Sequence, residues 1–360
     1  MFDLSGATSV SETMRRHARE IGDRPALAIV GTPVDRATAQ WLTYAQLDQA
    51  ARVFAQELRR ACPIGSRVLL LHPTSAEFVA GFLGCLYAGM VAVPSSMPGR
   101  YRQDQRRVLA IAEDAEVGCA LITPDEWDEV TTWVEQEGFT MPVLALRVDL
   151  TRHADDLDVF PADLQTLAVL QYTSGSTNDP KGNMVTHGNL LANAASMATA
   201  FPARDGRMYG GWLPNYHDMG LMGIILTPLL AGYGTALMRS CSSASGSQCM
   251  VAFGLCICWM AILAGILLHT PAAVPGVLIG AVMPLSFGSN VFASADSMPG
   301  WVQAWVNINP VTLMTEVNRA LLLGEGDVTG PLLGGLAWMA GFVAVFFPLS
   351  MRAYRRRLGR

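Results

Sequence analysis

Apolar residues up to about residue 240 occur in two kinds of run that alternate along the chain. Short apolar runs are typical of buried strands, and longer stretches with apolar residues three and four positions apart are typical of amphipathic helices. This alternation predicts an α/β fold, with a mostly parallel sheet covered by helices. The predicted strands are 26–29, 67–71, 91–94, 119–123 and 143–148, and the predicted helices are 11–21, 42–60, 75–88, 100–112 and 126–138.

The pattern changes after Arg239. From Ser240 to Ala295 the chain contains no Asp, Glu, Lys or Arg. Apolar residues then occur in runs of about 20, the length that a helix needs to cross a bilayer. A buried core helix is the alternative for each run taken alone. We therefore predict a second domain that is all-α and transmembrane, with about three helices, near 249–268, 273–292 and 331–351.

The overall composition conceals a division into two domains, residues 1–239 and 240–360. The formal net charge of −5 averages an ordinary charged α/β protein and an apolar segment, so it predicts no partner, and we expect no nucleic acid to bind. The seven cysteines lack zinc-ligand spacing, and we expect reduced thiols in the first domain. Residues 1–27 contain no apolar run of the signal-peptide kind, so we expect no cleaved leader.

A polar segment, residues 171–191, follows a predicted buried strand that ends at Leu170 and precedes a stretch with helical periodicity. Its string TSGSTNDPKG, residues 173–182, combines hydroxyl groups, glycines and one cation, Lys181. Backbone N–H groups in such a loop can converge on an anion, and small residues let a phosphate approach closely. Lys181 is the single lysine of the chain, which favours a required ammonium group. The segment predicts a phosphate-binding loop, with a solvated surface loop as the alternative.

Two common motifs do not fit this segment. Walker A requires Gly before the lysine and Ser or Thr after it, but Pro180 and Gly182 flank Lys181. The esterase motif G-x-S-x-G fails because Gly175 directly precedes Ser176. The string YTSGSTNDPKG instead resembles the phosphate-binding signature of adenylate-forming enzymes. A second string, WLPNYHDMGL at 212–221, is similar to a signature of the fatty acyl-AMP ligase branch of that family.

This resemblance implies a function. The family uses ATP and Mg²⁺ to convert a fatty acid to an acyl-adenylate, and this branch then passes the acyl group to an acyl carrier protein or polyketide synthase. Cationic and N–H donors must offset the phosphate charge before a carboxylate can attack. By resemblance, Lys181 and His217 are the catalytic residues, and Tyr216 and Asp218 bind the substrate. The residues that would hold the ATP phosphates are Thr173, Ser174, Gly175, Ser176, Thr177 and Gly182, and no protein ligand to a metal is identified.

The resemblance ends near Met238. The pattern of the family continues with an adenine pocket, acidic ligands for magnesium and ribose, and a lid with a second lysine, none of which we identify. We therefore expect a catalytically incomplete enzyme with weak nucleotide affinity, because phosphate contacts alone leave most of the ligand exposed. For His217, a structural histidine at the start of a helix is the alternative.

The segment from Pro284 to Gly324 resembles the last part of ABC exporter permeases of the daunorubicin-resistance type. In that family, short amphipathic helices on the outer side follow the fifth span. Trp301 and Trp305 suit anchoring at a membrane interface, and Pro310 suits a helix break. The resemblance implies an ABC ATPase subunit and a lipid bilayer as partners.

Charge predicts the orientation in a plasma membrane. The arginine-rich tail, residues 352–360, places the C-terminus in the cytoplasm. Counting back through three spans places residues 1–240 outside, whereas their resemblance to an ATP-using enzyme predicts the cytoplasm. These two predictions conflict.

Three interpretations remain open for the whole chain. It is an acyl-adenylating enzyme attached to a membrane, or a permease fragment that exports a lipid or drug. The third is an inactive chimera of parts of two genes.

Overall fold

The computed structural model of the chain describes residues 6–31, 38–99, 101–154, 157–173, 181–200, 208–238, 244–268, 273–290, 298–323 and 328–358. The chain divides into two compact units. The N-terminal unit comprises residues 1–31 and 35–240, and the helical unit comprises residues 32–34 and 241–360.

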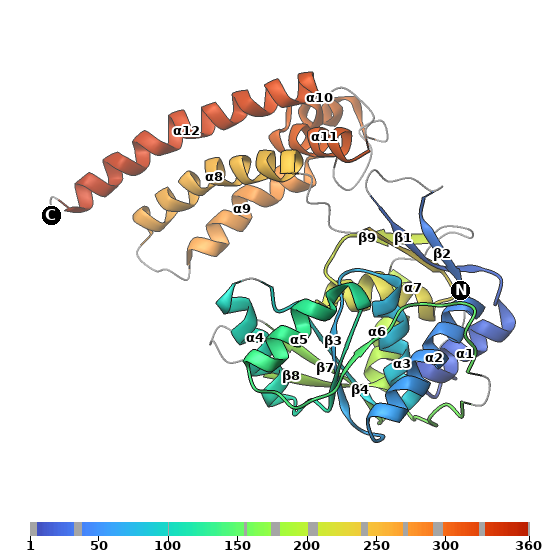
Figure 1. The fold of residues 1–360 in the computed structure, drawn as a ribbon. Helices are drawn as coiled ribbons and strands as arrows, with labels where there is room; N and C mark the ends of the chain where they lie inside the picture. Colours follow the sequence, from blue (N-terminus) through green and yellow to red (C-terminus); the bar gives the residue numbers. More distant parts are fainter. Residues whose placement is uncertain are drawn as a thin grey trace. The chain divides into compact units, whose positions relative to one another are not determined.

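A six-stranded sheet forms the centre of the N-terminal unit (Figure 1). Five of its strands are parallel, as the alternation of strand and helix predicts. The sixth, β8, is antiparallel to β7, so the sheet is mixed. The strand order is β6-β5-β3-β4-β7-β8, formed by β3 (Arg67–Leu71), β4 (Val91–Ser95), β5 (Cys119–Ile122), β6 (Val143–Ala145), β7 (Leu167–Thr173) and β8 (Lys181–Thr186).

Helices pack on both faces of this sheet because successive strand residues point to opposite faces. In β3, Val68 and Leu70 belong to the larger hydrophobic core, and Leu69 and Leu71 belong to a second core. The larger core receives residues from five helices, α1 (Val10–Glu20), α2 (Tyr44–Ala61), α3 (Ala76–Ala88), α6 (His187–Ala200) and α7 (Thr227–Leu230). The second core receives residues from α4 (Arg102–Asp114) and α5 (Trp127–Gln136), and the turn η1 (Pro124–Glu126) directly precedes α5 in the chain.

A second sheet of four strands was not predicted. Two neighbouring strands of this sheet, β1 and β10, are parallel, although they lie near opposite ends of the unit's sequence. The sequence predicts β1 but not its partners, because pairing between distant strands leaves little local signal. The order is β2-β1-β10-β9, formed by β1 (Pro25–Val30), β2 (Gln40–Thr43), β9 (Met208–Gly211) and β10 (Gly234–Met238), and the π-helix η2 (Met219–Leu226) lies between β9 and β10 in the chain.

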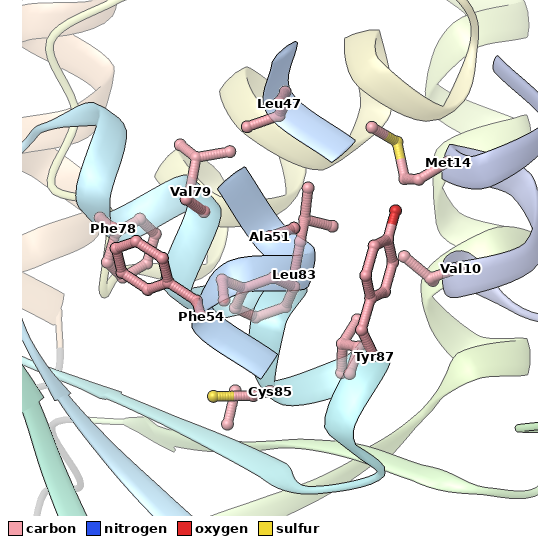
Figure 2. Close-up of a cluster of buried hydrophobic side chains, with 14 of the residues drawn as sticks. Val10, Met14, Leu47, Ala51, Phe54, Phe78, Val79, Leu83, Cys85 and Tyr87 are labelled. Carbon is pink, nitrogen blue, oxygen red and sulfur yellow. The ribbon is translucent and has the colours of Figure 1, made fainter. Parts of the chain in front are cut away.

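Helices α2 and α3 pack against each other in the larger core (Figure 2). All residues of α3 except Glu77 are buried. A Cβ atom added to Gly84 would lie 2.8 Å from Cβ of Phe54, so the glycine allows the two helices to approach closely. The Tyr87 O–H group donates to Oδ1 of Asp48 on α2, at 2.8 Å.

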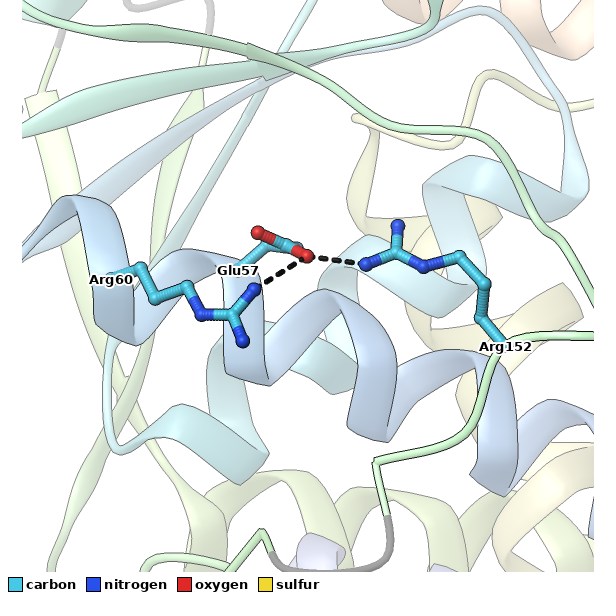
Figure 3. Close-up of polar contacts among 3 residues, drawn as sticks. All are labelled: Glu57, Arg60 and Arg152. Atoms are coloured by element: carbon cyan, nitrogen blue, oxygen red, sulfur yellow. Dashed lines mark hydrogen bonds and ion pairs between the residues drawn. The ribbon is translucent and has the colours of Figure 1, made fainter.

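The segment after β6 lies along α2 and is held there by polar contacts. Glu57 of α2 accepts from Arg60 at 3.1 Å and from Arg152 of the segment (Figure 3). Nη1 of Arg59 donates to the carbonyl oxygen of Asp158 at 2.6 Å. A surface ion pair such as Arg152–Glu57 contributes about 0–1 kcal/mol, so the contacts of Arg152 and Arg59 fix the path of the segment more than they stabilise the unit.

Among its described residues, the helical unit contains two helices that are long and apolar enough to cross a membrane, by length and composition. They are Cys249–Leu267 within α8 and Thr329–Arg357 within α12. Trp259 of α8 packs edge-on against Phe347 of α12, with ring centroids 4.8 Å apart. The helices of this unit are α8 (Ala244–Leu267), α9 (Ala273–Phe287), α10 (Gly300–Ile308), α11 (Pro310–Leu323) and α12 (Thr329–Leu358).

The span predicted at 273–292 is longer than the helix that the structure has there. Helix α9 ends at Phe287 after 15 residues, which corresponds to roughly 22 Å and is less than the thickness of a hydrocarbon core of about 30 Å. Nδ2 of Asn309 donates to the carbonyl oxygens of Leu285 and Gly288, at 2.9 and 2.8 Å. These contacts satisfy carbonyl groups at the end of the helix, where intrahelical partners are missing.

Candidate functional site

The predicted phosphate loop lies in the hairpin between β7 and β8. Lys181 is the first residue of β8 and pairs with Thr173 at the end of β7. Of the predicted phosphate-binding residues, Ser174, Gly175, Ser176 and Thr177 lie outside the described residues, as does the side chain of Thr173. The sequence predicted a helical stretch after the loop, but strand β8 comes first and α6 begins at His187.

The side chain of Lys181 is exposed, at the end of β8 that follows the loop. Alternate residues of a strand share a face, and paired residues of antiparallel strands point to the same side. Lys181 therefore lies on the same face as Asn183, which pairs with Gln171. Nε2 of Gln171 donates to the carbonyl oxygen of Tyr216 at 2.8 Å. This hydrogen bond ties the lysine-bearing hairpin to the second motif, residues 212–221.

A buried amide anchors the second motif to the main sheet. Asn215 is 2% exposed, and its Nδ2 lies 3.3 Å from the carbonyl oxygen of His72 and 3.2 Å from that of Pro73. These carbonyls directly follow β3. In parallel sheets, ligands usually bind outside the carboxyl ends of the strands. Asn215 thus holds the motif at the edge where such a site is expected.

His217 and Asp218 form an exposed pair at the start of η2. Nδ1 of His217 lies 2.6 Å from Oδ1 of Asp218, and the two side chains are 64% and 66% exposed. The same Oδ1 atom accepts from the backbone N–H of Met219 at 2.6 Å. We assign the hydrogen to Nδ1, because the contact with the carboxylate is much shorter than the 3.4 Å contact with Met219 N. This tautomer leaves the lone pair of Nε2 facing away from Asp218 and available to a ligand.

The chain folds back so closely before this pair that position 220 has no room for a side chain. A Cβ atom on Gly220 would lie 2.0 Å from the carbonyl oxygen of Pro214. The backbone N–H of His217 donates to the same carbonyl at 3.1 Å. Helix η2 is π-helical, a rare geometry that is frequent at functional sites. The close turn therefore places Asp218 as the N-cap of η2 and His217 directly before it.

Gly182 has a structural role that the sequence did not reveal. It pairs with Tyr172, and a Cβ atom at Gly182 would lie 2.8 Å from the tyrosine ring. The Tyr172 O–H group donates to Oδ2 of Asp114 at 2.5 Å, and burial, followed by this hydrogen bond, raises the pKa of the phenol. The packing of Tyr172 therefore accounts for Gly182 without a phosphate.

Three histidines that matched no motif occupy different environments. His153 is exposed. His187 is buried, and its Nδ1 accepts from the backbone N–H of Val10 at 3.1 Å. Burial lowers the pKa of His187 to about 4 and that of His72 to about 3. Both ring nitrogens of His72 lack a hydrogen-bond partner within the part of the chain that the structure describes.

A hydrogen bond connects two parts of the chain that carry predicted site residues. Lys181 and the segment containing Tyr216, His217 and Asp218 are linked through Gln171. Sequence reasoning missed both anchors, Gln171 and Asn215. Asn215 lies within the second motif and Gln171 directly precedes the first, but nothing local distinguishes an anchoring amide from a solvated one. In the described ranges, no group of three or more His, Cys, Asp or Glu side chains is arranged to hold a metal ion.

Comparison with known proteins identifies the family whose sequences share these motifs. Residues 14–266 match the model of the AMP-binding enzyme family. The match extends past Ser240 into α8. Among curated proteins, the chain is 37% identical over 205 residues to the long-chain-fatty-acid–AMP ligase FadD23 of Mycobacterium tuberculosis, covering 54% of this chain and 35% of that protein.

A second relative is the medium-chain-fatty-acid–[acyl-carrier-protein] ligase JamA of Moorena producens. It is 34% identical over 196 residues, covering 53% of this chain and 33% of JamA. The chain spans 41% or less of the length of these and other curated relatives that it matches.

Solved structures agree with the sequence comparison. The chain is similar to a fatty acid AMP ligase from Legionella pneumophila, with a TM-score of 0.59 and 32% identity, covering 66% of this chain and 40% of that one. A fatty acyl-adenylate ligase from the same organism, solved in complex with acyl adenylate and pyrophosphate, matches with the same values.

Proposed function

This chain belongs to the AMP-binding enzyme family, and we propose that its N-terminal unit takes part in the ATP-dependent adenylation of a fatty acid. The observation that carries this proposal is the Gln171–Tyr216 hydrogen bond, because it joins the lysine-bearing hairpin to the His217–Asp218 pair. Relatives whose names specify fatty-acid–AMP and acyl-carrier-protein ligases support fatty acids as substrates.

The described residues fit the phosphates of ATP through Lys181, whose exposed ammonium group lies at the mouth of the hairpin. ATP would supply the α-phosphate that the fatty acid carboxylate attacks, with release of pyrophosphate. Lys181 would offset the charge that opposes this attack. Asp218 would keep the hydrogen of His217 on Nδ1, so that Nε2 accepts a hydrogen bond near the reacting groups.

Magnesium fits the described residues less well. Asp218, the carboxylate of the second motif, is already engaged by His217 and by Met219 N–H. For the product, we propose transfer of the acyl group to a carrier protein or polyketide synthase, which the name of JamA supports.

The adenylation proposal is tested with the full chain in detergent. The chain is incubated with ATP, Mg²⁺ and fatty acids of different length, and acyl-AMP is measured by mass spectrometry. Lys181→Ala is expected to reduce acyl-AMP formation about 100-fold or more, as expected for loss of a charge-stabilising donor. Lys181→Arg restores the charge and part of the rate. The matched control is Arg107→Ala, at an exposed arginine of α4.

Two outcomes would count against adenylation. Acyl-AMP formation that is unchanged in Lys181→Ala would remove Lys181 from the mechanism. If the wild-type chain forms no acyl-AMP, adenylation by this chain is rejected. Nucleotide binding that depends on Lys181 would then indicate a binding site that has no activity.

For the helical unit we propose a location in the plasma membrane. In its two long helices only 11% of the most apolar window is buried, and large apolar side chains such as Leu255 and Val345 are exposed. Exposed apolar helices of this length favour lipid over water as their environment. With α8 and α12 as the two spans, an even count puts residues 1–240 on the same side as the arginine-rich C-terminus. This count removes the conflict that three spans created.

A permease role is the finer proposal for this unit. Helices α10 and α11 are short and follow α9, and the break between them falls at Asn309–Pro310. Trp301 is 81% exposed, which suits an interfacial residue. These features support the resemblance to ABC exporter permeases, whose partner would be an ATPase subunit. Labelling of single cysteines placed near residues 6 and 358 with an impermeant maleimide tests the orientation, and labelling of either one from outside the cell would overturn it.

A further inference from the structure

A cavity of about 290 Å³ lies in the N-terminal unit, away from the residues proposed for adenylation. One wall is the face of α1 that carries Ser11, Arg15 and Arg19. The opposite wall is the apolar segment from Val159 to Ala162, in the irregular stretch that follows β6. The complete lining is Thr8, Ser9, Ser11, Glu12, Arg15, Arg19, Val159, Phe160, Pro161 and Ala162.

The polar wall presents two cations on one stripe of α1. Ser11, Arg15 and Arg19 are spaced four residues apart, so their side chains lie one above another on the helix. Arg15 is half-buried and Arg19 exposed, and neither makes a hydrogen bond or ion pair with another described residue. Asp48 on α2 interacts with both at longer range, while its Oδ1 accepts from Tyr87.

Ser11 provides an independent indication of a ligand. The residue is 1% exposed, and its Oγ atom lacks a hydrogen-bond partner among the described residues. A buried hydroxyl without a partner is unfavourable, and most such groups are paired in folded proteins. The neighbouring Ser9 differs, because its Oγ accepts from Glu12 N–H at 3.0 Å and caps the helix. The unpaired hydroxyl is therefore that of Ser11, in the polar wall of the cavity.

The apolar wall is held in place. The backbone N–H of Phe160 donates to the carbonyl oxygen of Tyr87 at 2.9 Å. Its ring fills the space where a Cβ of Gly89 would lie, 2.5 Å from the ring. The contact between Arg59 and the carbonyl of Asp158 fixes the residues just before it. The cavity is thus a built site between two fixed walls.

We propose that this cavity binds a phosphate monoester with an apolar body. A phosphate offers three terminal oxygens, which matches the two guanidinium groups and the Ser11 hydroxyl, whereas a carboxylate offers two. The charge of Glu12 offsets one of the two arginines, and the lining keeps a net positive charge. The apolar part of the ligand lies against Val159, Phe160 and Pro161.

Phenyl phosphate is a suitable probe, and isothermal titration calorimetry on the full chain in detergent measures its binding. Arg15→Ala is expected to weaken binding about 10-fold or more, because a charge-assisted hydrogen bond is lost. Arg107→Ala on α4 is the matched control and is expected to have no effect. All measurements are repeated in the Lys181→Ala background, so that binding at the phosphate hairpin does not contribute. The result therefore does not depend on the proposed adenylation.

Ser11→Ala separates a binding role from a structural role. It removes a buried hydroxyl that has no partner in the free protein, so thermal stability is expected to be unchanged or higher. Phenyl phosphate binding is expected to weaken about threefold to tenfold. Unchanged binding in both Arg15→Ala and Ser11→Ala would overturn the proposal. Benzoate that binds as tightly as phenyl phosphate would overturn the choice of phosphate, and inorganic phosphate that binds as tightly would overturn the role of the apolar wall.

Discussion

Helices α3 and α8 are both strongly apolar, but their surroundings differ completely. In α3 all residues except Glu77 are buried between α2 and the six-stranded sheet. In α8 the large side chains Val251, Leu255 and Leu267 are each about 60% exposed. The difference shows that apolar composition alone does not specify an environment. In the N-terminal unit protein atoms surround the apolar residues, whereas large apolar side chains of the helical unit are exposed, which supports the membrane location proposed for it.

The largest expected effect tests the buried helix of this comparison, α3. Leu83 in α3 is fully buried, and Leu83→Ala is expected to lower the free energy of unfolding of the N-terminal unit by about 2–5 kcal/mol, through lost burial and the remaining cavity. Leu255→Ala in α8 is the matched change and is expected to alter that free energy by less than about 0.5 kcal/mol. Urea denaturation followed by tryptophan fluorescence measures both. Equal losses would mean that the two units unfold as one body.

The second prediction concerns the lipid side. Leu255→Arg places a charge near the middle of the long apolar segment of α8, which opposes membrane insertion by about 2.5–3.5 kcal/mol. We expect a lower fraction of the chain in membranes after carbonate extraction, with Leu255→Ala as the control. Retention equal to that of the wild type would contradict the assignment of α8 as a span.

The third prediction compares glycines inside the two helices. A Cβ at Gly84 would meet the backbone and side chain of α2, so Gly84→Ala is expected to destabilise the N-terminal unit by about 1–3 kcal/mol. Gly265 in α8 has no atom within 4 Å of such a Cβ, and Gly265→Ala is expected to be neutral or to favour the helix by up to about 1 kcal/mol. Thermal unfolding of each variant provides the measurement. Destabilisation by Gly265→Ala would show that α8 is closely packed.

The fourth prediction concerns pH and belongs to the N-terminal unit. Burial lowers the pKa of His72 to about 3, below the value near 6.5 of an unfolded chain. The unfolded state therefore binds more protons between these values, so stability is complete above about pH 6.5 and falls as the pH decreases, by about 1.4 kcal/mol per pH unit. His72→Leu is expected to make this dependence shallower between pH 7 and 5, with His187 still contributing. An unchanged slope in denaturation experiments would mean that the buried ring of His72 does not control it.

The sequence predicted most of the local elements of the N-terminal unit because their signals lie within short windows. The strand at 67–71 has the predicted bounds, and α3 and β4 agree within a residue. Strands β2, β8, β9 and β10 were missed. Strand β8 is mostly polar and exposed, and the pairing of β10 with β1 depends on residues far away in the chain.

The sequence by itself determined the family signature, the chemical identity of Lys181, His217 and Asp218, and the boundary between charged and apolar parts. These properties depend on residue type and spacing. Only the tertiary structure decided that Gln171 joins the two motifs and that Asn215 anchors the second motif to the residues after β3. It also decided that Tyr172 requires Gly182, and that Ser11 lies unpaired beside Arg15 and Arg19. Each of these relations joins residues through folding, and a hydrogen bond or a close approach between distant segments leaves no periodic pattern along the chain.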